Sequence, residues 1–254
     1  MSFDTAPLTN PTTAEAKTTM IKNILFAAAL IASLAYEPVA AAGYRKGGKG
    51  KGGKKERMRD NTRRITLEVT NLAFNQPFSP FFVMVHDPSV ELFKFGYPAG
   101  PELQDLAENG SPAKLVEKFY GMEGVLSAEV FSDGAPFFVG GSFEIPVRVN
   151  RRYPLVTIAS MAINTNDLIV ALNGVSPMPG SVYYSDGLDA GTEENNELCS
   201  SIPGPGCPMG SGNVASGNGE GVVHVHRGMH GVGDLAASAY DWRNPMMRVE
   251  VYDY

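Results

Sequence analysis

Three carboxylates in the second half of the chain are of the residue type that binds a hard metal cation. Asp167 comes directly before an apolar run, residues 168–172, and Asp189 and Glu193 flank a glycine in the segment 189–193. Ca²⁺ takes six to eight oxygen ligands at roughly 2.3–2.6 Å, and loop carboxylates backed by peptide carbonyls can supply them. Oxygen ligands disfavour zinc and copper. We therefore predict a Ca²⁺ site formed by Asp167, Asp189 and Glu193; the alternative is that acidic residues simply crowd solvated loops.

The four histidines offer a second kind of chemistry. His224 and His226 alternate in a segment typical of a strand, so both side chains should face the same way and could hold a transition metal with a third ligand. Alternatively these two residues, with His86 and His230, hydrogen-bond loop carbonyls or nearby carboxylates. The chain has no HExxH pattern to favour the metal. Both interpretations stay open.

The motifs of the common enzyme classes are missing from the sequence. There is no Gly-x-Ser-x-Gly elbow and no P-loop, and the glycine-rich stretch 210–221 does not join a strand to a helix. The cysteines have no defined histidine partner that would make a thiol nucleophile. We expect a non-catalytic protein, although loop carboxylates that meet at roughly 5 to 9 Å would leave glycoside hydrolysis open.

The elements that must position these residues are mostly strands. Residues 65–70 alternate apolar and polar side chains with period two, as in a half-buried strand, and residues 143–149 repeat the pattern. This periodicity, broken by Gly, Pro and Asn turns, predicts an all-β fold, an antiparallel β-sandwich of at least six strands. The other strands are expected at 155–163, 168–172, 222–226 and 246–252.

Two segments break this β pattern. Residues 101–108 and 112–119 each begin with proline and place apolar residues three or four apart, which is typical of short helices. Asn109 and Gly110 separate them. We predict two short helices in a connection between strands.

The N-terminal part of the chain is typical of an exported protein. A basic segment at residues 20–23, an apolar stretch at 24–35 and small residues at 39–43 resemble the three regions of a signal peptide. The apolar stretch is shorter than the roughly 20 residues that a membrane span needs. We predict an N-terminal extension with a signal-like segment over 1–42, starting at Met1 or Met20, and a secreted or cell-surface protein that does not span the membrane once processed.

Charge divides the rest of the chain into an arm and a domain. Residues 43–64 contain ten Lys and Arg against two acidic residues, whereas residues 65–254 contain nine Lys and Arg against 22 Asp and Glu. The Gly/Lys-rich arm cannot bury apolar surface, so we expect it to be disordered. It is either a spacer or an electrostatic tether to an anionic partner such as an acidic polysaccharide or phospholipid. Export and the lack of interleaved aromatic residues disfavour nucleic acid.

Two other local features carry structural predictions. Cys199 and Cys207 enclose a Pro/Gly loop, and in an exported chain such a pair is best interpreted as a disulfide. The only tryptophan, Trp242, lies between Asp241 and Arg243, a pattern that indicates a packed corner with an Arg–carboxylate bond.

From Ile65 to Tyr254 the chain resembles the spondin-N (F-spondin) domain family, in the form of bacterial and algal spondin domain-containing proteins. The resemblance covers nearly the whole mature chain, and its most specific motif is the Asp-Ala-Gly-Thr-acid segment. The matching stretches are residues 83–88 (VMVHDP), 103–110 (LQDLAENG), 160–167 (SMAINTND), 189–193 (DAGTE), 224–231 (HVHRGMHG) and 241–245 (DWRNP).

The resemblance implies a C2-like β-sandwich that serves in the extracellular matrix or in pattern recognition and holds one Ca²⁺ through three Asp. Those positions match Asp167, Asp189 and Glu193. Glu193 departs from the family by one methylene, which affects the geometry and affinity of the site more than the class of metal. The expected function is adhesion, or recognition of a matrix or cell-surface ligand, for which an anionic polysaccharide is one candidate.

Overall fold

Strand β1 (Arg63–Asn71) shows how the sequence builds the fold. Ile65, Leu67 and Val69 are buried, and the residues between them point to the other face of the sheet. In the computed structural model, which describes residues 62–254, β1 pairs with β4 (Ser142–Val149) on one side and β10 (Met247–Asp253) on the other. β7 (Val182–Ser185) completes a four-stranded antiparallel sheet in the order β4-β1-β10-β7.

A six-stranded antiparallel sheet faces the first sheet across the core. The order of its strands is β3-β2-β5-β6-β8-β9. The predicted antiparallel β-sandwich is therefore confirmed. The strands of this sheet are β2 (Phe81–His86), β3 (Val125–Phe131), β5 (Leu155–Met161), β6 (Leu168–Val175), β8 (Gly187–Asp189) and β9 (His224–Val225).

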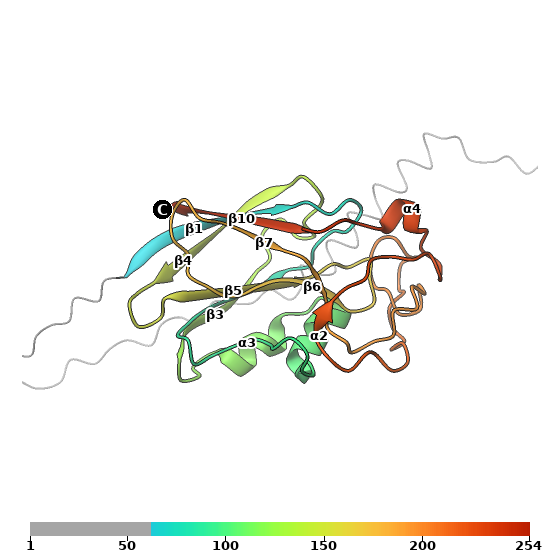
Figure 1. Ribbon diagram of the computed structural model, residues 1–254, viewed down its shortest axis with the longest axis horizontal. Coiled ribbons are helices and arrows are strands. Elements are labelled where there is room, and N and C mark those ends of the chain that lie inside the picture. Colours follow the sequence, from blue (N-terminus) through green and yellow to red (C-terminus); the bar gives the residue numbers. More distant parts are fainter. Residues whose placement is uncertain (1–61) are drawn as a thin grey trace, which may run out of the picture. The chain divides into compact units, whose positions relative to one another are not determined.

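The six-stranded sheet is buried on both faces. One face packs against the four-stranded sheet, and helices α2 (Pro101–Asn109) and α3 (Ala113–Phe119) cover the other face (Figure 1). Phe82 of β2 and Phe119 of α3 contact each other in this second layer, with ring centroids 5.7 Å apart. This cover explains why β2 and β5 have buried residues at nearly every position, without the alternation seen in β1.

The two predicted helices are present, and Gly110 separates them. Pro101 is the first residue of α2, where its missing N–H is not needed. Gly110 has a φ of 65° and its N–H donates to the carbonyl of Leu106, which closes the helix in the left-handed conformation that glycine tolerates. A third helix, α4 (Ala237–Tyr240), was not predicted and is a single turn.

The predicted strands are all present, but several have other bounds than expected. β5 ends at Met161 and not at residue 163, and β6 continues to Val175. The segment 222–226 forms a strand over two residues only, His224–Val225. Strand β1 begins at Arg63, two residues before the expected strand, because Arg63 and Arg64 pair with Val149 and Arg148 of β4. The signal-like segment and the rest of the basic arm lie outside the described residues. Within residues 62–254, no helix combines the length and apolar content needed to cross a bilayer.

A disulfide joins Cys199 to Cys207, as predicted. The loop that it closes docks on the start of the turn before β6, where the N–H of Gly206 donates to Oδ1 of Asn164 at 2.8 Å. Trp242 is buried at a corner, and Arg243 forms an ion pair with Asp241 beside it.

Candidate metal centre

Asp167 and Asp189 lie on neighbouring strands at one end of the six-stranded sheet. Asp167 directly precedes β6, as its apolar run predicted, and Asp189 is the last residue of β8. Leu168 pairs with Asp189 across the ladder, and the N–H of Ala190 donates to the carbonyl oxygen of Asp167 at 3.1 Å. Asp167 and Asp189 are 22 positions apart in the sequence. Backbone pairing of β6 with β8 therefore brings them together at the same end of the sheet.

The carboxylate of Asp167 is fully buried, at 0 % exposure. Its Oδ2 accepts hydrogen bonds from the N–H groups of Thr192 and Glu193 at 2.7 and 3.1 Å. Among the described residues, nothing bonds to its Oδ1. Burial raises the pKa of Asp167 to about 7, and the negative charge of Asp189 adds to the rise. The site therefore has negative charge that the protein alone does not compensate.

Asp189 is 1 % exposed and has hydrogen bonds on both carboxylate oxygens. Oδ1 accepts from the N–H of Gly191 at 2.7 Å, which shapes the loop that follows, and Oδ2 accepts from Nδ2 of Asn195 at 2.7 Å. Burial raises the pKa of Asp189, and the charge of Glu220 contributes in the same direction.

Glu193 is the third predicted ligand and is also buried, at 3 % exposure. Its Oε1 accepts a hydrogen bond from the N–H of Ser216 at 2.9 Å, and its Oε2 has no partner among the described residues. Burial raises the pKa of this carboxyl as well, with a smaller contribution from the charge of Glu108. The Glu193 backbone N–H is bonded to Asp167, so this residue belongs to the same end of the sandwich.

Buried oxygens without hydrogen-bond partners bear on whether Asp167, Asp189 and Glu193 could bind a cation. Only three buried side-chain atoms in residues 62–254 lack a hydrogen-bond partner: Gln76 Oε1, Asp167 Oδ1 and Glu193 Oε2. Two of the three belong to the predicted calcium ligands. An unsatisfied buried polar atom is costly, and a bound ion is one of the few explanations for it. Three carboxylates are the donor set that a hard divalent cation prefers, but in the described residues no choice of one oxygen from each brings all three within 4.8 Å of one another.

Glycine at position 191 lets a second loop approach this site. Gly191 has a φ of +69°, and a Cβ there would lie 2.4 Å from the carbonyl oxygen of Val222. Instead the N–H of Gly221 donates to the Gly191 carbonyl at 2.9 Å. The segment around Gly219 and Val222 therefore lies backbone against backbone on the loop of residues 189–193.

This second loop brings a mixed group of ligands to Asp189. Asp189, Glu220 and His224 each offer one ligand atom, and these atoms lie within 4.8 Å of one another, so the group could hold a metal ion. The group shares only Asp189 with the predicted calcium ligands. Sequence reasoning missed Glu220, which lies in a glycine-rich stretch with no periodicity and becomes relevant only through the contact at Gly191.

The histidines of the 224–231 stretch fall into two roles. The Nε2 atoms of His224 and His226 both lie near Asp189 Oδ2, at 3.8 and 3.9 Å, as expected from their alternation. His226 is buried and hydrogen-bonded at both ring nitrogens, to Asn195 Oδ1 and to the N–H of Gly228. Burial lowers the pKa of His226 to about 4, so the ring is neutral at pH 7.

The other two histidines are not part of this group. His86 is buried, with ring hydrogen bonds to the Asp87 carbonyl at 2.9 Å and to Thr157 Oγ1 at 2.8 Å. This is the structural role that the sequence offered as the alternative to metal binding. His230 has an exposed side chain, and its backbone N–H donates to Glu197.

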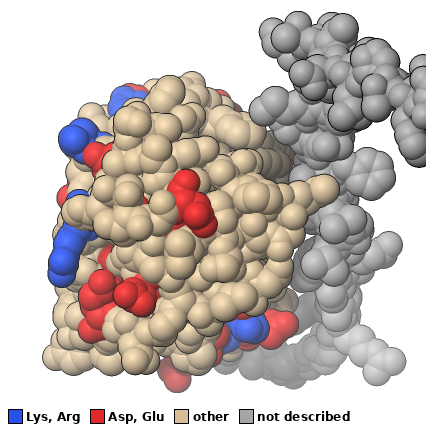
Figure 2. All heavy atoms as spheres, turned by 90° about the vertical axis from the view of Figure 1, so that its right-hand side faces the viewer, with Lys and Arg blue, Asp and Glu red and all other residues tan. Residues whose placement is uncertain are grey.

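Acidic side chains also mark the surface at this end. Figure 2, which looks onto the end of the sandwich where the loops after β8 gather, shows acidic groups on a mostly uncharged surface, with the basic side chains toward its edges. Such a surface raises the local concentration of cations.

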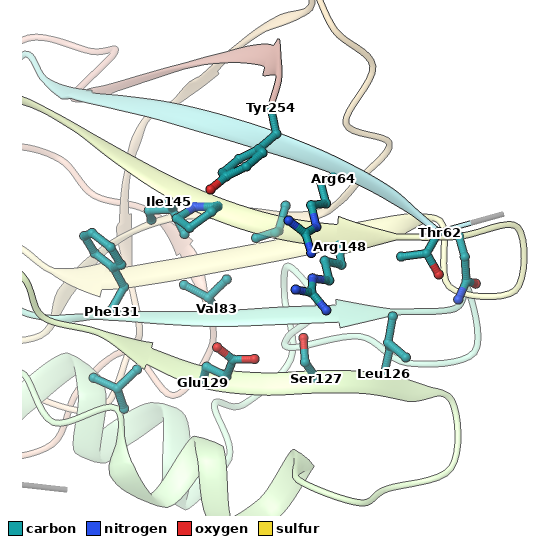
Figure 3. A pocket seen from close by; sticks show the side chains of 14 residues that line it. Thr62, Arg64, Val83, Leu126, Ser127, Glu129, Phe131, Ile145, Arg148 and Tyr254 are labelled. Carbon is teal, nitrogen blue, oxygen red and sulfur yellow. The ribbon is translucent and has the colours of Figure 1, made fainter. Parts of the chain in front are cut away.

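A groove of about 710 Å³ lies between the edge strands β3 and β4 and takes no part in the metal group. Arg64 and Arg148, which are cross-strand partners, reach into it together and face Ser127 and Glu129 of β3 (Figure 3). Its floor is apolar, with Val83 and Ile145.

A scan against models of known protein families finds no match to this chain, and a search of curated proteins finds none either.

Proposed function

We propose that this domain is a non-catalytic, calcium-binding β-sandwich that acts outside the cell in adhesion or in recognition of a matrix or cell-surface ligand. Asp167, Asp189 and Glu193 would hold the ion. The observation that carries the proposal is the pair of buried carboxylate oxygens without partners, Asp167 Oδ1 and Glu193 Oε2, on two of the three residues selected from the sequence.

The role of the ion follows from the charges at the site. Three buried carboxyl groups have raised pKa values, which means that their ionised forms are destabilised in the metal-free fold. A divalent cation would stabilise the ionised forms and join the loop of residues 189–193 to the start of β6. Calcium would therefore order the loops at this end, where an adhesive contact would form.

The extracellular part of the proposal has separate support. The stretches that resemble spondin-N motifs span the domain from β2 to the corner at Trp242, and the Cys199–Cys207 disulfide is typical of proteins in oxidising compartments. The signal-like segment agrees with export. An anionic polysaccharide remains one candidate ligand, which calcium or the basic arm would contact.

Thermal unfolding of the full chain tests calcium binding. At about 100 times its Kd, calcium would add about 2.7 kcal/mol to the free energy of unfolding, and so raise Tm by about 5–10 °C for a domain of this size. Asp189→Asn should abolish the increase and Glu193→Gln should weaken it. Asp186→Asn, an exposed site three residues away, is the matched control and should keep it. A wild-type Tm that is the same in calcium and in chelator contradicts the proposal.

A further inference from the structure

We propose that Asp189 Oδ2, Glu220 and His224 Nε2 form a second metal site, for a borderline transition metal such as Zn²⁺. The site shares Asp189 with the proposed calcium site but uses other residues for the rest of its ligands. It goes beyond the proposed function, because neither Glu220 nor His224 is needed to bind calcium.

The hydrogen bonding of His224 prepares one ring nitrogen to bind a metal. Its Nδ1 lies 3.0 Å from the carbonyl oxygen of Val222. A carbonyl only accepts hydrogen bonds, so Nδ1 carries the proton, and in the neutral ring Nε2 then has a free lone pair. Nε2 bonds to no other described residue and lies 3.8 Å from Asp189 Oδ2. This arrangement, with the far nitrogen fixed by a backbone carbonyl, is that of metal-binding histidines.

The distances suit a shared ion better than a direct bond. The 3.8 Å between His224 Nε2 and Asp189 Oδ2 is too long for a hydrogen bond. Two ligand atoms held about 2.1 Å from one zinc ion at tetrahedral angles are about 3.4 Å apart. Small side-chain movements would therefore close the group, whose atoms lie within 4.8 Å of one another.

The mixed donor set points away from calcium. Calcium takes oxygen ligands, whereas an imidazole nitrogen with two carboxylates suits zinc and related transition metals. Glu220 is exposed and His224 is partly exposed, while Asp189 is buried. The site is thus open to solvent on the Glu220 side, which gives the ion an entry path and leaves water to complete its coordination.

Asn195 and His226 hold this group in place. Asn195 Nδ2 donates to Asp189 Oδ2 at 2.7 Å and to Glu220 Oε1 at 3.3 Å. Because Nδ1 of His226 accepts the N–H of Gly228, its Nε2 carries the proton and donates to Asn195 Oδ1 at 2.8 Å. His226 is therefore a positioning residue and not a ligand, even though its Nε2 is as close to Asp189 as that of His224.

The test is zinc binding to the full chain, purified without a histidine tag and measured by calorimetry. His224→Ala and Glu220→Gln should each weaken zinc binding at least tenfold. His230→Ala, an exposed histidine six residues away, is the matched control and should bind zinc within twofold of wild type. Glu193→Gln should leave zinc binding within twofold while it weakens the stabilisation by calcium, which separates the two sites.

Nitrogen NMR of the wild-type protein is a second test, which does not require the variants to fold correctly. Zinc should shift the ¹⁵N resonance of His224 Nε2 strongly and leave that of His226 Nε2 nearly unchanged. If added zinc shifts neither resonance, the second site is refuted. Equal zinc affinity of His224→Ala and His230→Ala also refutes it. Either result leaves calcium binding untouched, because that proposal has its own measurement.

Discussion

Asp167 and Asp189 are held side by side by the backbone of β6 and β8, through the Leu168–Asp189 pairing and the hydrogen bond from the Ala190 N–H to the Asp167 carbonyl. The ladder, and not the side chains, sets their separation. The negative charge of Asp189 accordingly raises the pKa of Asp167. Repulsion between these two carboxylates therefore lowers the free energy of unfolding of the metal-free domain at neutral pH. Removal of one of the two charges should raise it.

Asp167→Asn should stabilise the chelated protein at neutral pH. The pKa of Asp167 is about 7 in the fold against about 3.9 in an unfolded chain. Between these values the folded state binds more protons, so stability is lost as pH rises through about 4 to 7. The variant does not titrate and should gain about 1–3 kcal/mol over wild type at pH 7.5, and little at pH 4. Urea unfolding in chelator measures both values.

Asp167→Asn could change stability by removing a buried charge or by weakening hydrogen bonds. The direction of the pH dependence distinguishes these two effects. The amide oxygen of the asparagine in Asp167→Asn would still accept the N–H groups of Thr192 and Glu193 that now bond to Asp167 Oδ2. A variant that is less stable than wild type at both pH values would show that the carboxylate stabilises the metal-free fold, contrary to the expectation from its raised pKa.

Calcium binding should weaken as pH falls below about 7. The cation has to displace the proton that Asp167 holds below its pKa of about 7. If one proton is displaced, apparent affinity should fall about tenfold for each pH unit below that value. Calorimetry at pH 5.5, 6.5 and 8 measures the trend, and in buffers of different ionisation enthalpy it counts the protons released. A pH-independent affinity would place the ion away from Asp167.

The sequence was sufficient for those parts of the fold that local patterns encode. Alternation revealed β1 and β4, and proline with three-to-four spacing revealed α2 and α3. β2 was not predicted as a strand because all six of its residues are buried, a pattern that a short helix segment shares. β7 and β8 have four and three residues, too few to show a period.

The candidate site also has residues that local sequence patterns could place and residues that only contacts between loops bring together. Asp167 could be placed at a strand start because the apolar run after it is local. The approach of Glu220 and His224 to Asp189 depends on the close contact of Gly191 with Val222, which joins two loops through backbone atoms. No side-chain pattern encodes such a contact. Likewise, nothing in the sequence showed that Ser216 would occupy one oxygen of Glu193.

His226→Gln should have the opposite pH dependence to Asp167→Asn. The folded-state pKa of His226 is about 4, below its unfolded value of about 6.5. The stability that this neutral ring contributes is present above about pH 6.5 and is lost as pH falls through about 4. Relative to wild type, the variant should therefore improve by about 1–3 kcal/mol from pH 7.5 to pH 4.5. Urea unfolding at both pH values measures the difference.

The control for this variant is His230→Gln, because that side chain is exposed. Its stability relative to wild type should change little between the two pH values. If His226→Gln and His230→Gln behave alike, the burial of His226 does not depress its pKa as argued.

Reduction of the Cys199–Cys207 disulfide should lower stability without loss of calcium binding. The bond closes a loop between cysteines eight positions apart. In the chain-entropy account, loss of a cross-link that closes a loop of this size lowers the free energy of unfolding by about 2–3 kcal/mol. The loop docks on Asn164, and none of the three predicted ligands lies within it. The Cys199→Ser, Cys207→Ser double variant should unfold at lower urea concentration and keep its calcium affinity within about threefold. A much larger loss of affinity would show that the disulfide loop supports the ligands directly.

Gly191→Ala and Gly180→Ala separate the two costs of replacing a glycine. Both residues have positive φ, +69° and +86°, so alanine is strained at each. A Cβ at Gly180 meets nothing within 4 Å, whereas at Gly191 it would lie 2.4 Å from the Val222 carbonyl oxygen. Gly180→Ala should cost about 1 kcal/mol. Gly191→Ala should cost clearly more, because two backbone segments must separate, and that separation moves Glu220 and His224 away from Asp189. Urea unfolding measures the loss of stability, and titrations with zinc and with calcium measure the effect on metal binding. Equal stability losses in the two variants would show that the Gly191–Val222 contact does not hold the second loop at the site.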